Sequence, residues 1–462
     1  MAEFDLGFAD EETVRELSVR RKEPAWFLAD RLVALSNFKA LRIEEHQLYT
    51  KYTDVSRARV SGTDPYTKPS NPAMNTVTEL AGVSGIYSQE EDTVETLFLD
   101  PELERKGVVF ETLQSAVSDR QLRLRPLMFD HPSLPERDKF AQMTKALCMA
   151  GIVLHVPDDV SISKPIVIRW SVGRENTALL TRTVVSLGNN SNAVVVEEIE
   201  PSRAAGGSRM ALFGGTAEVT LGDGSTLKYN GVANVGGGVA TFLNRQASVG
   251  AGSEIQWAFG YVGGEMIRSH IDTFLNGKRA TVKEVQVLYG DRSQFYDIFS
   301  HTRHLAEDTV SDLLSKGVLQ DQAKAYAKGL ITIEKGGKGS DSYLGEFGMV
   351  LSRDSRFLSI PSLEIENHAV KRAKHASSVA QIDENQIFYL TSRGIEESEA
   401  RKLIVMGFLE PVVARIPLES VATRLRGLFE SKWVSKDSAR KEETVPPTRS
   451  LYPPNGSGIG VR

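Results

Sequence analysis

The sequence contains a single cysteine, Cys148, among its 462 residues. One cysteine cannot form a disulfide within the chain, and it cannot supply the paired thiolates of a Cys-x-x-Cys metal site. This scarcity fits a reducing compartment, where structural disulfides are rare. Because Cys148 lies in a helical pattern, it is more typical of a small buried side chain than of a reactive thiol.

The sequence also lacks an excess of basic residues, since 55 lysines and arginines stand against 60 acidic residues, for a formal net charge of −5. A general nucleic-acid binder needs a basic surface, so no nucleic-acid partner is expected. No apolar run reaches the roughly 18 residues of a membrane span, and the acidic first residues lack the order of a signal peptide. We therefore expect a cytoplasmic protein that has no membrane contact.

Nucleotide-binding loops are missing as well. A P-loop requires Gly-x4-Gly-Lys-Ser/Thr, and the nearest string, KGGKGSDS, has Gly339 where the hydroxyl residue belongs. The triple glycine at 236–238 is better explained as a flexible corner than as a cofactor loop. The acidic pairs at 158–159 and 197–198 lie beside turn signals, which account for them without a catalytic cleft.

What the sequence does contain is a change of texture along the chain. Residues 1–145 read as mainly helical, with Pro24 suited to a first helical turn and apolar residues following at helical spacing. From 146 to 380, short β-branched runs alternate with turn residues. Residues 381–432 return to a helical pattern. The segment 433–462 is rich in proline and glycine, so we expect it to be disordered.

The middle region repeats one unit, an apolar residue followed by a glycine-containing polar turn and a strand. Four copies begin at Leu187, Leu221, Val249 and Leu275, so their starts are 34, 28 and 26 residues apart. Stacked β coils need such repetition, because each coil buries its inner face only against its neighbours. A β-sandwich also has short strands and glycine turns, and strands alone do not distinguish the two folds. The repeated turn-then-strand unit favours the solenoid.

Residues 381–432 have the pattern of a helical hairpin. Asp383 and Gln386 fit a capping box, and Gly394 can end the first helix in the left-handed conformation. A second helix is predicted from Glu396 to Arg415, because its apolar residues follow one side.

Four blocks of the sequence together resemble the SufB/SufD family of iron–sulfur cluster assembly scaffolds, and are most similar to SufD-type members. The blocks are KEPAWFLADRLVAL, ALCMAGIVLHVPDDVSISKPIVI, SQFYDIFSHTRHLAED through KGGKGSDSY, and LEIENHAVKRAKHASS through MGFLEPVVARIP. They occur in family order across about residues 20–420. The resemblance implies a mainly β fold, in which a right-handed parallel β-helix core is flanked by an N-terminal helical region and a C-terminal helical domain.

The resemblance also implies a role and partners. The family supplies scaffold subunits, so this chain is expected to be no enzyme. The β-helix edges of SufB and SufD pair, and each C-terminal domain docks a SufC ATPase, which accounts for the missing P-loop. We expect a SufC-like ATPase as one partner, and a SufB-like homologue or a second copy of this chain as the other. The candidate contacts with the ATPase are Phe388, Arg393, Gly394, Glu399, Leu403 and Phe408.

The cluster-building site of the family lies between SufB and SufD. SufB contributes a cysteine, and the aligned position in this sequence is Glu346, so the thiolate is absent. SufD carries a histidine in a Ser-His-Gly-Ala-like turn, and KHASS places His375 there. Because a neutral imidazole can ligate iron, His375 is the one candidate metal ligand. The isolated chain is expected to hold no cofactor, with a transient iron–sulfur cluster reserved for the complex. No flavin motif can be placed.

Two alternatives remain. A SufB-like subunit would host the nascent cluster itself, and the missing cysteine argues against it. A carbohydrate-active β-solenoid enzyme would place carboxylates across a cleft. The helical hairpin and the absence of a secretion signal argue against that enzyme.

Overall fold

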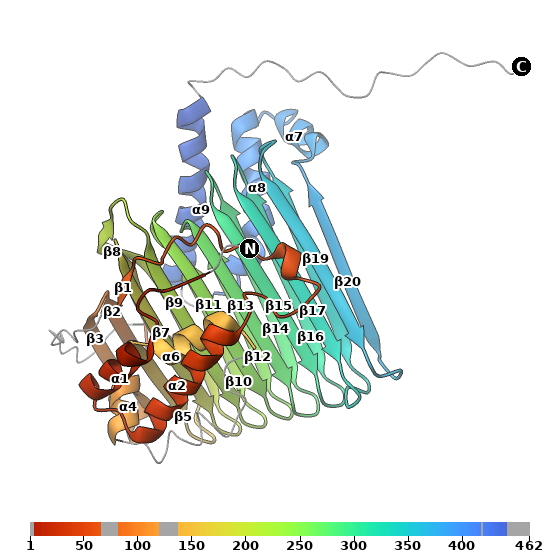
Figure 1. Ribbon diagram of the computed structural model, residues 1–462. Helices are drawn as coiled ribbons and strands as arrows, with labels where there is room; N and C mark the ends of the chain where they lie inside the picture. Colours follow the sequence, from red (N-terminus) through yellow and green to blue (C-terminus); the bar gives the residue numbers. More distant parts are fainter. Residues whose placement is uncertain (1–3, 66–81, 120–136, 417–418, 441–462) are drawn as a thin grey trace, which may run out of the picture.

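Two ten-stranded sheets run the length of the molecule (Figure 1). In the computed structural model, which describes residues 4–65, 82–119, 137–416 and 419–440, consecutive strands from β5 onward alternate between these sheets. Odd-numbered strands from β5 to β19 form sheet A, and even-numbered strands from β6 to β20 form sheet B. Each odd–even pair is one coil, so the described strands build eight coils. The predicted parallel β-solenoid is confirmed.

Sheet A comprises β1 (Asp64–Pro65), β4 (Val109–Thr112), β5 (Ala150–Val156), β7 (Thr177–Leu187), β9 (Ala211–Leu221), β11 (Val239–Val249), β13 (Met266–Leu275), β15 (Phe295–His304), β17 (Lys324–Ile333) and β19 (Arg356–Ile365). Sheet B comprises β2 (Gly85–Glu90), β3 (Thr93–Leu99), β6 (Ile166–Arg174), β8 (Asn192–Gly206), β10 (Thr226–Ala233), β12 (Glu254–Tyr261), β14 (Thr281–Gly290), β16 (Val310–Leu319), β18 (Asp341–Val350) and β20 (Arg372–Ala380).

The described helices lie before and after the coils. Those that precede them are α1 (Glu11–Arg20), α2 (Ala25–Ala40), the short 3₁₀ helix η1 (Thr50–Tyr52), α3 (Pro101–Arg105), α4 (Leu113–Asp119) and α6 (Lys139–Leu147). Those that follow are α7 (Glu384–Thr391), α8 (Glu397–Val413) and α9 (Glu419–Arg440).

The repeated sequence unit forms the corner at which each odd strand turns into the next even strand. The αL residues Asn190, Gly224 and Gly252 stack there, and each donates its backbone N–H to a carbonyl of the following coil at 2.8–2.9 Å. The stack is continued along the solenoid by Arg279 and Asp308. Glycine and asparagine tolerate this backbone conformation well. The polar turn in the repeat therefore positions successive coils in register.

The hydrophobic core lies between the two sheets. Trp170 and Trp257 are fully buried there, and Tyr229 lies with its ring centroid 5.3 Å from that of Trp257. Burying one large apolar side chain contributes roughly 1.5–3 kcal/mol. The inward side chains of each coil pack against those of the next coil, so the solenoid has one continuous core.

The N-terminal region contains short strands besides its helices. Strand β2 pairs in parallel with β6, β3 pairs antiparallel with β2, and β4 pairs antiparallel with β5. These short strands extend both sheets beyond the first coil, because the first coil would otherwise present unpaired backbone groups at its edge. The solenoid therefore receives strands from within residues 1–145.

A strap, defined here as residues 41–63, crosses the outer face of sheet A (Figure 1). Tyr49 of the strap is completely buried, and it packs on sheet A against Phe299, Leu330 and the half-buried Ile360. The Tyr49 hydroxyl donates to the carbonyl of Gly329 at 3.1 Å. The strap is thus fixed to strands β15, β17 and β19.

Helices α8 and α9 cover part of the outer face of sheet B. Val405 and Leu409 of α8 join Leu425 and Phe429 of α9 in one apolar cluster with residues of sheet B. Helix α9 continues to Arg440, past the predicted start of a disordered tail at 433, because buried Trp433 extends the same apolar stripe. The rest of that tail, 441–462, lies outside the described residues.

Close backbone approach at one corner makes a glycine indispensable. A Cβ on Gly277 would lie 2.0 Å from the backbone nitrogen of Ala251, whereas a Cβ on Gly237 would meet nothing within 4 Å. We expect Gly277→Ala to lower the free energy of unfolding by about 1–3 kcal/mol, as overpacking does. The control Gly237→Ala should stay within about 0.5 kcal/mol of the parent. Urea denaturation of both variants measures this, and equal stabilities would contradict the corner geometry.

Candidate functional site

The last coil leaves the end of each sheet open among the described strands, at β19 in sheet A and at β20 in sheet B. Strand β20 pairs with β18 on one side and, within the described chain, with no strand on the other. All nine of its residues are exposed or half-buried. An edge strand of this kind presents unpaired N–H and C=O groups that can accept a further strand. Arg372 and Lys374 give this edge basic charge, the first being paired with Asp341 at 2.6 Å.

His375 lies on the inward face of this open coil. It is in register with Leu344 of β18, and residues side by side in neighbouring parallel strands point to the same face. Leu344 packs between the sheets against Ile331 and Ile333, so the imidazole of His375 faces the space between the sheets, at the exposed end. No group of three or more metal-binding side chains is assembled among the residues that the structure describes. A complete metal site at His375 would therefore need ligands besides those that the described residues bring together.

Glu346 lies under the same coil, in register with Ser377 of β20. Its side chain is 1% exposed, and its Oε2 accepts hydrogen bonds from the Ser359 hydroxyl at 2.5 Å and from the Ile360 backbone N–H at 2.9 Å. Burial disfavours the charged form and raises the pKa of Glu346 to about 8, although both hydrogen bonds oppose that rise. Glu346 is thus a buried acid that binds β19 from within the core.

A polar row that the sequence did not reveal runs through the core toward this coil. Glu346 follows Ser315 and Gln286 on one ladder of sheet B. The Gln286 amide donates to Glu284 at 2.9 Å and to the Ser300 hydroxyl at 2.8 Å. Burial raises the pKa of Glu284 to about 7. The signal in the sequence was a polar residue at the same strand position in successive repeats, but only the register shows that this position faces inward.

Helices α7 and α8 form the hairpin, and the expected contact residues differ in their exposure to solvent. Phe388 is 73% exposed and Leu403 is 47% exposed, while Arg393, Gly394 and Glu399 are also exposed. Gly394 has a φ of +86°, as a residue that ends a helix requires. Phe408 differs because it is half-buried, with the Lys316 ammonium 4.8 Å from its ring centroid. Phe408 holds α8 on sheet B, so it is not part of the exposed face of the hairpin.

The acidic pairs do not form a cleft. Asp158 accepts the Asn189 backbone N–H at 2.7 Å in a corner turn. Glu197 faces the core and pairs with Arg245 at 2.6 Å, whereas Glu198, next to it on β8, faces outward and pairs with Arg169 at 2.7 Å. Adjacent strand residues point to opposite faces, so these carboxylates cannot act together on one sugar.

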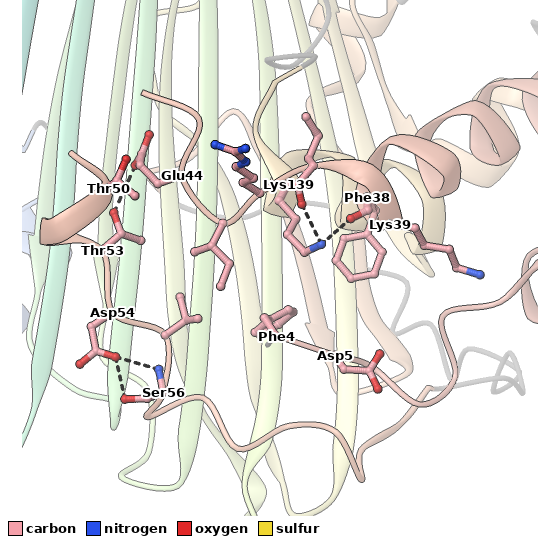
Figure 2. Close-up of a pocket in the computed structure, with 14 residues that line it drawn as sticks. Phe4, Asp5, Phe38, Lys39, Glu44, Thr50, Thr53, Asp54, Ser56 and Lys139 are labelled. Atoms are coloured by element: carbon pink, nitrogen blue, oxygen red, sulfur yellow. Dashed lines mark hydrogen bonds between the residues drawn. The ribbon is translucent and has the colours of Figure 1, made fainter. Parts of the chain in front are cut away.

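A cavity of about 840 Å³ lies away from the last coil, between the N-terminal segment, the end of α2 and the strap (Figure 2). Its polar side chains hold these segments together. The Lys139 ammonium donates to the carbonyls of Phe38 and Leu41 at 2.6 and 3.1 Å, and the Thr53 hydroxyl donates to Glu44 at 3.2 Å. Among the described residues, no helix has the length and apolar character to cross a membrane.

Comparison with known proteins agrees with this architecture, a parallel β-solenoid with an open last coil and a helical hairpin. Residues 170–408 match the family model described as "SUF system FeS cluster assembly, SufBD core domain". The iron–sulfur cluster assembly protein SufD of Bacillus subtilis is 27% identical over 435 residues, which cover 92% of this chain and 98% of that protein. A SufBD family protein of Staphylococcus haemolyticus is 25% identical over 454 residues, covering 91% and 95%.

The chain therefore belongs to the SufBD family of iron–sulfur cluster assembly proteins. Within that family it is SufD-like.

The buried acid makes stability depend on pH in a predictable direction. Because the folded-state pKa of Glu346 lies near 8, above the usual 4.5, the folded chain binds more protons than the unfolded chain between these values. Its contribution to stability is thus lost as pH rises from about 4.5 to 8. In Glu346→Gln, the introduced amide stays neutral at every pH, and its oxygen can still accept from Ser359.

Glu346→Gln should therefore gain stability over the parent by up to about 1.4 kcal/mol per pH unit within this window. Urea denaturation of both proteins at pH 5, 6, 7 and 8 tests this expectation, and a pH-independent difference would contradict it.

Proposed function

We propose that this chain is a non-catalytic scaffold subunit that builds iron–sulfur clusters in a complex with two kinds of partner. One partner is a SufB-like homologue, or a second copy of this chain, joined through the last coil. The other is a SufC-like ATPase that docks on the α7–α8 hairpin and carries out the ATP hydrolysis. The complex would work in the cytoplasm. The observation that carries it is the open edge of β20, which can continue sheet B into a second chain.

The last coil suits the joint because its backbone edge is open and its outward face is basic. Strand β20 carries Arg372 and Lys374 on its outward face, and its inward face exposes His375 and Ser377. Adding a strand from a partner would cover the open end of the core and enclose His375 between two chains. The partner would then supply the thiolate that Glu346 cannot provide, and the cluster would form as cargo at the joint, with no cofactor in the isolated chain.

The hairpin suits the ATPase because it presents large apolar side chains to solvent. Phe388 and Tyr389 are 73% and 53% exposed on α7, and Leu403 projects from α8. The Arg393 guanidinium lies 4.2 Å from the Tyr389 ring centroid and adds charge beside this patch. Closure of two ATPase subunits would pull on the hairpin, and the rigid solenoid would carry that force to the joint.

Substitution of His375 tests the cluster site. His375→Ala should leave the fold and the complex intact, because the imidazole is exposed at the end of the core. The yield of cluster formed with the SufB-like partner and ATPase, read from visible absorption under anaerobic conditions, should fall. His368→Ala is the matched control, since His368 is exposed in the loop before β20. An unchanged yield in His375→Ala would remove the ligand role.

Charge placed on the hairpin tests the docking face. Phe388→Asp and Leu403→Asp should each abolish co-purification with the cognate ATPase, because a carboxylate cannot enter an apolar contact without a large desolvation cost. Both side chains are exposed, so thermal unfolding should stay within a few degrees of the parent.

Val33→Asp is the control for this pair, because Val33 is also exposed but lies on α2. Retention of the ATPase by both hairpin variants would exclude this docking face.

A further inference from the structure

Helix α9 extends diagonally over several coils of the solenoid. Near its start, Arg424 pairs with Glu200 of β8. One residue on, Leu425 packs on Gly260 of β12, where an added Cβ would lie 3.0 Å from the leucine side chain. Further along, Phe429 contacts Tyr289 of β14, with ring centroids 6.3 Å apart. One helix thus touches the coils of β8, β12 and β14.

Lys432 anchors α9 where it reaches the corners of the solenoid. Its side chain is 9% exposed, and the ammonium lies 3.0 Å from Asp291 Oδ1 and 2.6 Å from Gln294 Oε1. The Lys432 carbonyl accepts from the Gln320 amide at 3.3 Å. Residues 291–294 connect β14 to β15, and Gln320 lies in the connection from β16 to β17. This one residue therefore fixes α9 to two successive corners.

Ion pairs attach the hairpin to α9. The Arg401 guanidinium of α8 pairs with Glu384 of α7 at 3.3 Å. Arg426 of α9 pairs with Glu410 of α8 at 3.1 Å, and a further ion pair joins Lys402 of α8 to α9 at 3.6 Å. With the shared apolar cluster, these contacts make α7, α8 and α9 one unit. A force on the hairpin would reach α9, and the buried ion pair of α9 would pass it to the corners.

We propose that Lys432 is a positioning residue that couples the hairpin to the coils, so that nucleotide binding by a docked ATPase moves the corners at 291–294 and 320–323. This inference rests on the proposed docking of the ATPase at the hairpin. A purely structural role would make Lys432 matter for stability alone. If Lys432 has a coupling role, its loss abolishes the response of the corners to nucleotide while the ATPase stays docked.

Hydrogen–deuterium exchange on the assembled complex, with and without a non-hydrolysable ATP analogue, tests the inference. In the parent we expect the ATPase to protect residues 388–403, and nucleotide to change the exchange of residues 290–294. Lys432→Met should keep the protection at the hairpin and lose the change at the corner, and Lys432→Arg should restore it. Lys278→Met is the control, because it removes an ion pair, with Glu307 at 2.9 Å, at the corners where odd strands turn into even strands. It should behave as the parent.

The outcomes separate the two proposals. A nucleotide response at 290–294 that survives Lys432→Met, or a parent complex with hairpin protection but no corner response, would overturn the coupling role. Absence of hairpin protection in the parent would reject the docking face itself, and the coupling with it. If Lys432→Met does not fold, Asp291→Asn removes the opposite partner of the ion pair and should abolish the corner response in the same way.

Discussion

The parallel backbone ladder between successive coils is the interaction on which the rest of the structure depends. Successive coils satisfy each other's N–H and C=O groups, and among the described parallel ladders the register shifts only in the pair β6–β8. Such a stack does not terminate itself, because its last coil always has unpaired backbone N–H and C=O groups at its edge. At the start of the solenoid the chain covers that edge with β2, β3 and β4. At the other end, within the described residues, it leaves β19 and β20 without a further paired strand.

The difference between the covered start and the open end of the solenoid explains several features of the C-terminal third. The inward face of β20 continues a buried polar row that contains Glu284 and Glu346, two carboxyl groups whose pKa values burial raises. The strap fixes β19 from outside through Tyr49, and Glu346 binds it from inside through Ser359 and Ile360. Strand β20 has only its ladder to β18 among the described strands. The molecule thus supports β19 of the last coil on both faces and leaves β20 available to a partner.

The sequence was a good guide where one local unit repeats. The polar turn that begins at Leu221 or Val249 has a local physical cause, since an αL residue and a close backbone approach are needed at every corner. The coils could therefore be predicted. So could the hairpin, because Gly394 marks the end of its first helix. The strands in GIYSQE and VFET lie outside the repeat and are short, so the region that holds them read as mainly helical. The burial of Tyr49 could not be foreseen, because its hydrogen-bond partner is 280 residues away.

The site was harder to predict for the same reason. The position of His375 on an exposed strand followed from its block, but the inward direction of its side chain depends on register with Leu344. The burial of Glu346 depends on that register as well. Phe388 and Phe408 look equivalent as aromatic residues on neighbouring helices. Only the packing of α8 on sheet B shows that one is exposed and the other is held under a lysine of β16.

The central claim is that the open edge of β20 joins this chain to a second one. Residue-resolved hydrogen exchange across 372–380, for the chain alone and mixed with the SufB-like homologue, measures this directly. The account predicts that the backbone amides of β20 that point away from β18 exchange rapidly in the isolated chain and become protected in the mixture. Exchange of those amides that is already slow in a monomer, or that stays rapid in a stable complex, would contradict it.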